Sequence, residues 1–447
     1  MVKKVLLTSI VLLIAIPVFS FEHIRCYTDN YISNKMEQNP DFEKAFHQTY
    51  DYIYNMARHN RDMNDSVIFR IPVVVHVVYN TPQQNVHDSL IFNQIEVLNQ
   101  DFRRQNPDTS LTREIFLPYA GDAGIEFFLA EEDPDGNPTN GITRTETSEV
   151  TFMDFADLDK VKSSATGGVD AWPTDVYLNI WVCNLNFVFG GTEFPGVLGF
   201  AYPPVGAPNW PQDMLPNNPD VEGVVVHYQA FGRNNPEAVG PLEVVSRGRT
   251  TTHEVGHYLG LRHIWGDAGF GQNGCDVDDG IDDTPNQADA SQQTCNYNQN
   301  SCVISPVNYP DMLENYMDYS DERCMNMFTH GQIAVMRMVL RELRPDLAIQ
   351  EHPPVTSVNE NLAFNQKHVI YPNPVADKLY VSMNEAMPIG LVEIYDMKGR
   401  QLKAKNFNHL NYQKLMLETN QLATGNYILK IHSGKTVIVD RFNVAGN

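Results

Sequence analysis

The sequence predicts an α+β domain followed by a small all-β sandwich. A β-branched run typical of a buried strand, VIFRIPVVVHVVYN at residues 67–80, opens the first domain, and apolar residues at helical spacing follow in residues 89–106. From residue 367 onward the composition changes. The chain there lacks cysteine, carries ten Lys or Arg against six Asp or Glu, and alternates short strand-like runs with turns.

Further strands are expected along the first domain, and a helix should close it. This helix is expected in residues 328–347 and should end at Pro345. Paired prolines without apolar periodicity make residues 349–366 a linker. The first domain therefore covers residues 65–348 and the second residues 367–447. The additional strands are expected within residues 124–132, 141–148, 176–185, 198–204 and 223–231.

Two segments precede the first domain. Lys3 and Lys4, followed by the apolar run from Val5 to Phe19, are typical of a signal peptide, which we place at residues 1–20. The alternative, a membrane anchor, needs about 20 apolar residues, and this run has about 15. The mature chain is therefore expected to be exported, with no transmembrane anchor. Residues 21–64, called the leader below, are polar and show helical periodicity.

Charge and cysteine content narrow the class of protein. The formal net charge of −23 argues against nucleic-acid binding, which requires a cationic surface. Four of the six cysteines lie within about fifty residues and predict two disulfides, as suits an exported protein. Spacing alone leaves three pairings open for them. Cys183, in an apolar strand, and Cys26, in the leader, are expected to be unpaired.

The stretch TTTHEVGHYLGLRHIWGD, residues 250–267, carries a metal-binding pattern. On a helix, His253 and His257 project from the same face, and their neutral imidazole rings can bind one zinc ion. His263 can supply a third ligand and leave a fourth position open, as catalytic zinc sites require. Glu254 is then placed to accept a proton from the metal-bound water. Histidines that only satisfy core hydrogen bonds have no reason to keep this spacing.

The ends of this helix can also be predicted. Thr250 or Thr251 is the expected N-cap, because a hydroxyl oxygen can accept a hydrogen bond from the first turn. Gly260 is the expected stop, because glycine adopts the left-handed conformation that ends a helix. The chain could then turn back and bring His263 to the metal.

An unusually acidic stretch, CDVDDGIDDTPNQAD, follows the histidines. Crowded carboxylates repel one another unless a hard cation such as calcium holds them. The alternative is an ordinary solvated acidic loop. The stretch lacks the spacing and the final glutamate of an EF-hand. Its acids are Asp276, Asp278, Asp279, Asp282, Asp283 and Asp289.

HEVGHYLGLRH resembles the zinc signature of the metzincins, and the surrounding residues resemble the pappalysin branch of cytophagalysin- and ulilysin-like enzymes. IPVVVHVVYN, YLNIWVCNL and LGFAYPP extend the resemblance over the first domain. It implies a metzincin-type mixed sheet with an active-site helix and a zinc-dependent endopeptidase activity. In ENYMDYSDERC, it implies that Met317 lies beneath the metal and that Tyr319 stabilises the reaction intermediate. The strand in LGFAYPP is expected to pair with extended substrate.

The same resemblance assigns roles in the acidic stretch. It implies one or two structural calcium ions, with Asp279 and Thr284 as first-choice ligands and Asp278 and Asp283 behind them. It also selects one of the three disulfide pairings, namely Cys275 with Cys302 and Cys295 with Cys324.

Precursors in this family carry a leader cysteine that keeps the enzyme latent, and Cys26 is the matching residue. The usual glycine after that cysteine is tyrosine here, so an incidental thiol is the alternative. Relatives often favour arginine beside the cleaved bond, and Glu322, next to Asp321, is the expected partner of that arginine. Arg58 and Arg61 would then mark autolytic maturation.

The last eighty or so residues resemble the C-terminal sorting domain of the type IX secretion system. The motifs are HVIYPNPVADKLYV, VEIYDMKGRQL and GNYILKIHSGK. The resemblance implies that the secretion machinery is a partner and that the protein crosses the periplasm of a Bacteroidota-type bacterium to the cell surface or medium. An accessory carbohydrate-binding sandwich is the alternative, although no aromatic platform stands out.

The sequence therefore predicts a secreted zinc endopeptidase made as a latent precursor and acting on protein or peptide substrates. One rival is a non-catalytic binding module on the same scaffold, which the presence of Glu254 and all three histidines disfavours. Another is a metal-dependent hydrolase of non-peptide substrates, which the methionine turn and the precursor layout disfavour.

Overall fold

The computed structural model describes residues 23–59, 67–204, 221–267, 273–303, 308–351, 368–396, 400–433 and 436–445. The predicted signal peptide and Arg61 lie outside these ranges. The chain divides into two compact units, Met1–Pro353 and Pro354–Asn447, which are described separately. Within the described ranges, no helix combines the length and hydrophobicity needed to cross a membrane.

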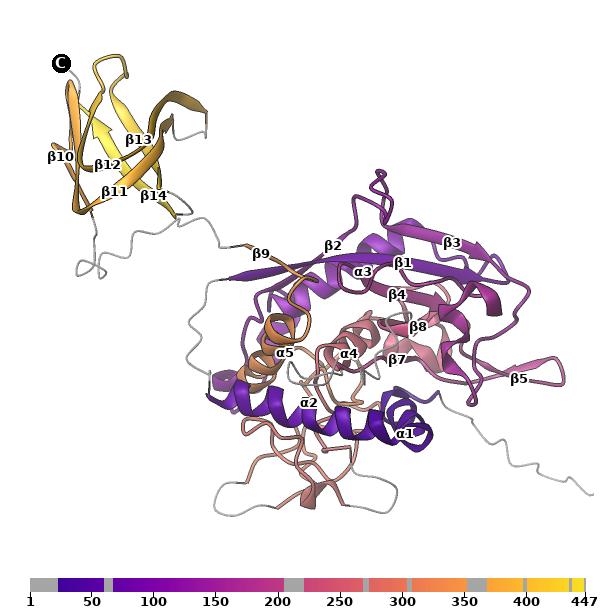
Figure 1. Ribbon diagram of the computed structural model, residues 1–447. Coiled ribbons are helices and arrows are strands. Elements are labelled where there is room, and N and C mark those ends of the chain that lie inside the picture. Colours follow the sequence, from indigo (N-terminus) through magenta and orange to yellow (C-terminus); the bar gives the residue numbers. More distant parts are fainter. Residues whose placement is uncertain are drawn as a thin grey trace, which may run out of the picture. The chain divides into compact units, whose positions relative to one another are not determined.

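A mixed sheet forms the centre of the first unit, as predicted (Figure 1). β1 runs parallel to β4 on one side and to β2 and β3 on the other. β8 continues parallel to β4, and β7 closes this path antiparallel to β8. Every residue of β4 and β8 is buried, as expected for strands covered on both faces. The bounds are β1 (Ile68–Tyr79), β2 (Ile125–Leu129), β3 (Ile142–Glu146), β4 (Leu178–Cys183), β7 (Gly199–Ala201) and β8 (Val224–His227).

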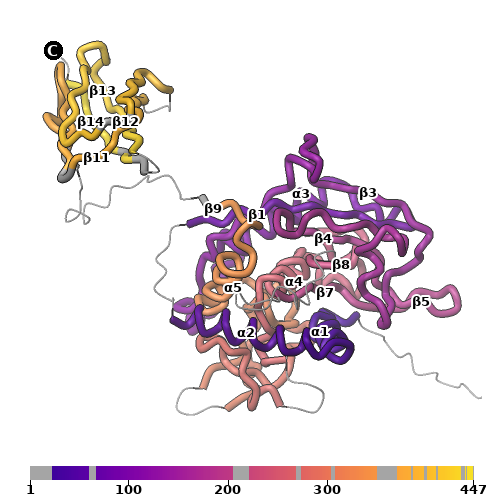
Figure 2. The backbone as a smooth tube through the Cα atoms, in the orientation of Figure 1, coloured from indigo at the N-terminus to yellow at the C-terminus, as the bar shows by residue number. Residues whose placement is uncertain are grey.

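Five α-helices lie in the described part of this unit, and α1, α3 and α4 contact strands of the sheet. α4 packs on β7, β8 and α3, so it lies beneath the end of the sheet that β7 closes. The first two helices belong to the leader: α1 packs on β7 and α2 packs on α5 (Figure 2). The leader is therefore part of the folded first unit. The bounds are α1 (Thr28–Gln38), α2 (Pro40–His59), α3 (Asp88–Phe102), α4 (Arg249–Tyr258) and α5 (His330–Glu342).

The end of the first unit differs from the prediction. α5 ends at Glu342 rather than at Pro345, because the residue before a proline avoids helical backbone. The expected linker begins with a strand, β9 (Ile349–Glu351), which pairs antiparallel with the start of β1. A short hairpin of β5 (Phe187–Phe189) and β6 (Thr192–Phe194) completes the unit.

The second unit is all-β, as predicted, but its five strands form one continuous antiparallel sheet. Register shifts along β11 and β12 interrupt the ladder, and such irregularities let a sheet bend over its own core. Val375 bridges to Val444 at the end of β14, so the sheet approaches a closed barrel rather than two stacked sheets. The bounds are β10 (His368–Tyr371), β11 (Lys378–Asp396), β12 (Gln401–Glu418), β13 (Gly425–Ser433) and β14 (Thr436–Val444).

Candidate metal centre and substrate cleft

Helix α4 is flanked by two glycines, Gly248 directly before it and Gly260 two residues after it. The prediction of a threonine N-cap is wrong, because Gly248, with φ 77°, precedes the first turn. The hydroxyls of Thr250 and Thr251 instead donate to Glu322 and Gln94, both at 2.9 Å. Gly260 has φ 89° and follows the last turn as predicted. Every side chain of α4 is buried, so its position is fixed on all sides.

The three predicted histidines converge on one point. The Nε2 atoms of His253, His257 and His263 lie 3.0, 3.1 and 3.2 Å from one another. Burial lowers the pKa of His253 well below its usual value and that of His257 to about 3, so these rings are neutral. Each Nδ1 faces an acceptor at 2.7–2.8 Å: Tyr316 O, Leu261 O and Asp267 Oδ1, respectively.

This arrangement fits a zinc ion. A neutral imidazole that donates from Nδ1 to one of these oxygens presents an unprotonated Nε2. Three such nitrogens cannot hydrogen-bond to one another, and their lone pairs repel at this distance. A cation shared by the three rings removes the conflict, and three imidazole nitrogens are a donor set that zinc prefers.

Glu254 lies beside this point, completely buried. Its Oε2 accepts from the Thr28 hydroxyl at 3.0 Å and the Cys26 thiol at 3.4 Å, and its Oε1 has no hydrogen-bond partner. Burial raises the pKa of Glu254 to about 8. β7 passes so close that a Cβ at Gly199 would lie 2.9 Å from Oε1. A side chain at that position would displace Glu254.

Met317 and Tyr319 approach the histidines from the loop before α5. Met317 is fully buried, and its sulfur would lie 2.5 Å from a Cβ at Gly256, so it packs directly on α4 between two of the histidines. The Tyr319 ring lies 5.6 Å from the His253 ring and 4.9 Å from the His263 ring. Its hydroxyl donates to the carbonyl oxygen of Cys26 at 3.3 Å.

The leader passes over the centre along β7. Ile24 exchanges two backbone hydrogen bonds with this segment, donating to Gly196 O and accepting from Leu198 N, and Tyr27 N donates to Gly199 O at 2.9 Å. The bridge between residues 24 and 197 is parallel. Cys26 is buried, and its sulfur joins the three Nε2 atoms in a group whose members all lie within 4.8 Å of one another. The edge expected to bind substrate therefore holds the chain's own leader.

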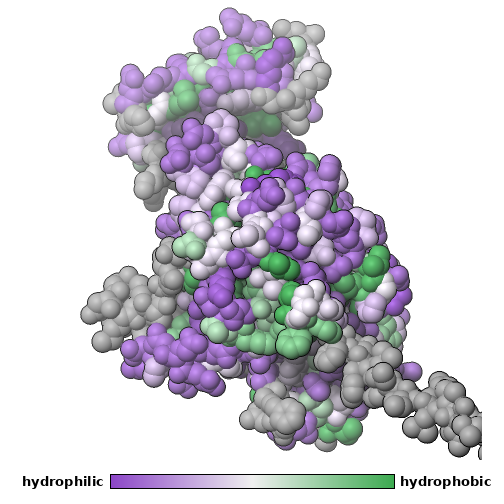
Figure 3. Space-filling model, turned by 90° about the vertical axis from the view of Figure 1, so that its right-hand side faces the viewer, coloured by the Kyte–Doolittle hydropathy of each residue, from purple (hydrophilic) through white to green (hydrophobic). Residues whose placement is uncertain are grey.

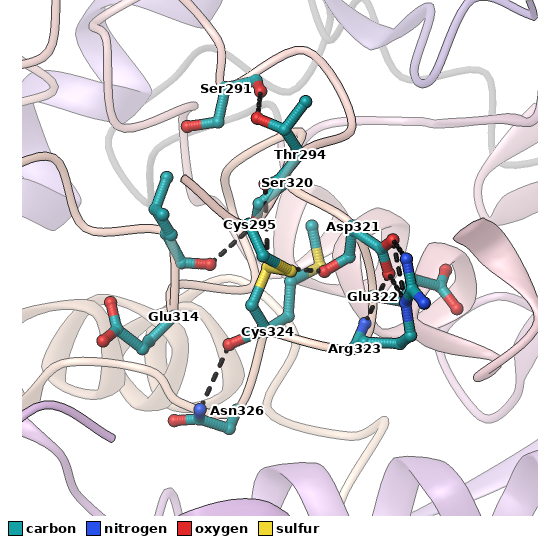
Figure 4. Close-up of a disulfide and its surroundings, with 12 residues drawn as sticks. Ser291, Thr294, Cys295, Glu314, Ser320, Asp321, Glu322, Arg323, Cys324 and Asn326 are labelled. Atoms are coloured by element: carbon teal, nitrogen blue, oxygen red, sulfur yellow. Dashed lines mark hydrogen bonds and ion pairs between the residues drawn. A yellow bond between two sulfur atoms is a disulfide. The ribbon is translucent and has the colours of Figure 1, made fainter. Parts of the chain in front are cut away.

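Arg25 fills a buried pocket next to the histidines. Its Nη2 donates to Glu322 Oε1 at 3.2 Å, and both side chains are almost completely buried. Glu322 Oε2 accepts from the backbone N–H of Arg247 at 2.7 Å, which fixes the carboxylate. Asp321 is not in this contact, because it pairs with Arg323 (Figure 4).

Both expected disulfides are present, Cys275–Cys302 and Cys295–Cys324. Cys26 and Cys183 are free and buried. Figure 4 shows that the Cys295–Cys324 bridge lies beside Asp321 and Glu322. The bridge therefore ties the loop after the acidic stretch to the wall that carries Glu322.

The carboxylates of the acidic stretch do not converge on one point as the three histidines do. Asp279 is buried and accepts from Thr284 Oγ1 at 2.8 Å and Ile281 N at 2.9 Å, and burial raises its pKa well above the usual value. Asp278 is exposed, whereas Asp283 accepts from Gly331 N and has one buried oxygen without a partner. Among the described residues, no three carboxylates of this stretch come close enough to share one ion through side chains alone.

Comparisons with known proteins agree with this geometry. Residues 242–341 match the family of pregnancy-associated plasma protein-A. A structure of mature mirolysin from Tannerella forsythia with a cleaved peptide is 44% identical, with a TM-score of 0.53, and the match covers 63% of this chain and 96% of mirolysin. The chain belongs to the pappalysin family of metalloproteases. Membership of this family implies a catalytic zinc ion.

Other relatives match the chain in part. A promirolysin mutant from T. forsythia is 39% identical over 72% of this chain and 96% of its own, with a TM-score of 0.59. An extracellular metalloprotease of Arthroderma benhamiae is 36% identical over 162 residues, and the match spans only 49% of that relative's length. One from Arthroderma gypseum is 27% identical over 297 residues, or 80% of its length.

Residues 369–445 match the secretion system C-terminal sorting domain.

Some residues of this pappalysin site were not predicted from the sequence. Asp267 and Asp29 both face the Nδ1 of His263, at 2.7 and 2.9 Å. Burial acts to lower the pKa of His263, but these carboxylates outweigh it and raise that pKa. Asp267 follows His263 by four residues in HIWGD, a spacing that could have indicated it. Asp29 and Arg25 flank Cys26, and only the path of the leader brings them into the cleft.

An apolar rim borders the leader of this pappalysin. The Tyr27 ring packs against Phe155 at 5.4 Å, and Phe155 packs against Phe187 at 5.1 Å. Phe155 keeps 48% of its surface exposed. Figure 3 shows the side of the molecule that carries β5 in Figure 1, where hydrophobic surface gathers below the centre of the view with hydrophilic surface around it.

Proposed function

We propose that this chain is the precursor of a secreted zinc endopeptidase whose leader keeps it latent. His253, His257 and His263 would hold the ion, and the closeness of their Nε2 atoms is the observation that supports this most directly. Bound zinc would polarise the scissile carbonyl and make the attacking water more acidic.

Glu254 is the proposed general base. Its unpartnered Oε1 is a free acceptor beside the histidines, so it can accept a proton from the attacking water and later donate it to the departing amine. Tyr319 is the proposed oxyanion-stabilising residue. Its hydroxyl is held by the leader carbonyl of Cys26, and removal of the leader would free it to donate to the substrate's carbonyl oxygen.

The leader, residues 21–64, is the proposed latency segment, and Cys26 its central residue. The thiol lies at the histidines and against Glu254, where it would occupy the position that water needs. The match to the promirolysin mutant covers about 40 residues more of this chain than the match to mature mirolysin, 72% against 63%, which is about the length of the leader. Cleavage near Arg58 or Arg61 would release it.

Arginine next to the cleaved bond is the proposed preference. Arg25 supports it, because this leader arginine already occupies a buried pocket with Glu322 at its end. A buried carboxylate held by a backbone amide strongly favours a guanidinium partner over a neutral side chain.

Calcium binding in the acidic stretch remains a proposal. Asp279 with Thr284, and the unpartnered oxygen of Asp283, are the side-chain groups that would contribute, with Asp278 at the exposed edge. Backbone carbonyls would have to complete the coordination. Such an ion would be structural rather than catalytic.

Export by the type IX secretion machinery is the proposed role of the C-terminal unit, with residues 1–20 as the cleaved signal peptide. The match of residues 369–445 to a sorting domain supports this proposal. A chain that ends before residue 367 should accumulate in the periplasm. Normal release of the truncated chain would refute the proposal.

The catalytic proposal is tested with the processed chain, on casein and on arginine-containing peptides. Both should be cleaved, and Glu254→Ala or a zinc chelator should abolish cleavage. A folded, zinc-loaded, processed chain that cleaves neither substrate would move the assignment to a binding module on a protease scaffold.

A further inference from the structure

A second side chain of the leader, besides Arg25, fills a pocket in the cleft. The Tyr31 hydroxyl donates to Asp159 Oδ1 at 2.8 Å, and the side chain of Tyr31 is almost completely buried. Lys35, one turn further along α1, donates to Asp159 Oδ2, also at 2.8 Å. Asp159 therefore receives two donors from a segment that maturation is proposed to remove.

The walls of this pocket suit an electron-rich ring. The Lys162 ammonium lies 5.2 Å from the Tyr31 ring centre, within the range of a cation–π contact. Phe200 and Tyr202 pack on the same ring, at 5.3 and 6.2 Å. Lys162 is itself fixed, because its side chain is fully buried and its Nζ donates to Val221 O at 2.7 Å.

The pocket keeps its charge after the leader is gone. Burial alone would raise the pKa of Asp159, but the Lys162 and Lys35 ammonium groups hold it at about 2. Lys162 also binds Oδ1, at 2.9 Å, and stays in place in the processed chain. Once the leader is gone, Oδ1 loses the Tyr31 hydroxyl and Oδ2 loses Lys35, so the carboxylate would present free acceptor positions to the cleft.

The pocket lies on the track that the leader follows along β7. Arg25 is at Glu322, Cys26 is at the histidines, and Tyr31 is at Asp159, so the two pockets flank the centre. Phe200, which contacts Tyr31, belongs to β7 itself. Cys26 and Tyr31 are separated by roughly 11 Å of chain, at about 3.3 Å per extended and 1.5 Å per helical residue. An extended substrate spans that distance in about three residues.

We propose that, in the processed enzyme, Asp159, Lys162, Phe200 and Tyr202 form a substrate subsite selective for tyrosine. It lies on the opposite side of the cleaved bond from the Glu322 pocket. This assignment rests on the proposed endopeptidase function and adds a second specificity determinant to it. Tyrosine fits because one residue supplies the ring, the terminal donor and the length that the leader uses there.

Discrimination between tyrosine and phenylalanine follows from the carboxylate. A phenylalanine ring would fill the same space but would not supply the hydroxyl donor that Tyr31 gives to Asp159. A site built to bind a hydroxyl rejects the analogue that lacks it, because the buried polar group then stays unpaired. We expect a preference of about 10- to 100-fold in kcat/KM.

The test uses processed wild-type enzyme and peptides with one arginine at the cleaved bond. Tyrosine and phenylalanine are compared at each of the four positions on the side of that bond away from the arginine. Tyrosine should be preferred over phenylalanine at one position, and Asp159→Asn should remove this preference. Cleavage of a peptide too short to reach the pocket should not change. Asp154→Asn, which changes a partly exposed acid of the same segment that pairs with Lys160, is the matched control.

A second measurement does not depend on the folding of Asp159→Asn. Synthetic peptides of residues 23–38, with and without Tyr31→Phe, are compared as inhibitors of wild-type enzyme, and Tyr31→Phe should weaken inhibition about tenfold or more. Equal cleavage of tyrosine and phenylalanine at all four positions, or a preference that survives Asp159→Asn, would overturn the subsite alone. Absence of any cleavage would instead refute the proposed function, and the subsite with it.

Discussion

The histidine centre on α4 and the acidic stretch that follows it differ in how their side chains are held. Each imidazole of the histidine centre is fixed by a hydrogen bond at Nδ1, and two of the three come from a fully buried helix. In the acidic stretch, Asp279 is buried while Asp278 is exposed on an irregular loop. Other groups of the protein hold the histidine side chains in place, whereas the acidic stretch would need an ion to bring its oxygens together.

The two regions are therefore expected to serve different functions. A preorganised site can carry chemistry, because no reorganisation is required at the moment of reaction. A loop that an ion draws together gains stability from that ion. Changes at the histidine centre should therefore affect turnover, and changes in the acidic stretch should affect the free energy of unfolding.

The largest effect is expected from Glu254→Gln. The amide keeps the size of the side chain but cannot accept the proton of the attacking water, so kcat should fall about 10²- to 10⁴-fold. The melting temperature should not fall, because the amide has the same size and adds no charge. Glu243→Gln, at an exposed position, is the control, and a Glu254→Gln enzyme with normal kcat would break the assignment of the histidine centre.

Cys26→Ala in the uncleaved precursor should give the next largest effect. Without the thiol at the histidines, the precursor should cleave small peptides at least about tenfold faster than the wild-type precursor. Activation should be partial, because Arg25 and the backbone pairing with β7 still cover the cleft. Cys183→Ala, at the other buried free cysteine, should remain latent, and a latent Cys26→Ala precursor would contradict the account of latency.

Glu322→Gln should change specificity rather than turnover in general. Loss of the buried carboxylate should lower kcat/KM for arginine peptides about 30-fold or more, because an arginine entering the pocket would lack its charged partner. Cleavage of peptides with a neutral residue at that position should change little. Cleavage profiles of the two enzymes on one peptide library measure this. An unchanged arginine preference would mean that Glu322 does not bind the substrate arginine.

The smallest effect is expected from Asp279→Asn, which tests whether the acidic stretch affects stability rather than turnover. Calcium should raise the melting temperature of the wild-type chain by several degrees and that of the variant by much less. At low temperature, kcat should stay within about twofold of wild type. Equal stabilisation of both proteins by calcium would mean that Asp279 is not a ligand, and a collapse of kcat at low temperature would erase the distinction between the two regions.

Regular elements of the first unit were predictable because their spacing carries the information. His253, Glu254 and His257 follow from helical geometry alone, and Gly260 from the need to end that helix. The buried strands follow from β-branched runs. The strand at Ile349–Glu351 was missed because three residues are too few to show a period.

Contacts made across long distances in the chain could not be predicted. Gly248 replaced the expected threonine cap because Thr250 and Thr251 are used by Glu322 and Gln94, which lie far from them in sequence. Arg25 and Tyr31 look like ordinary residues of a polar leader. Their pockets appear only when the loop that carries Glu322 and the segment around Asp159 are brought beside that leader.

The most direct test of the central claim is the zinc content of the processed chain, measured together with its activity. We expect one zinc ion per wild-type chain, retained by Glu254→Gln and lost by His257→Ala, with activity lost in both variants. Normal proteolysis by a zinc-free His257→Ala chain would contradict the claim that these three histidines form the catalytic metal centre.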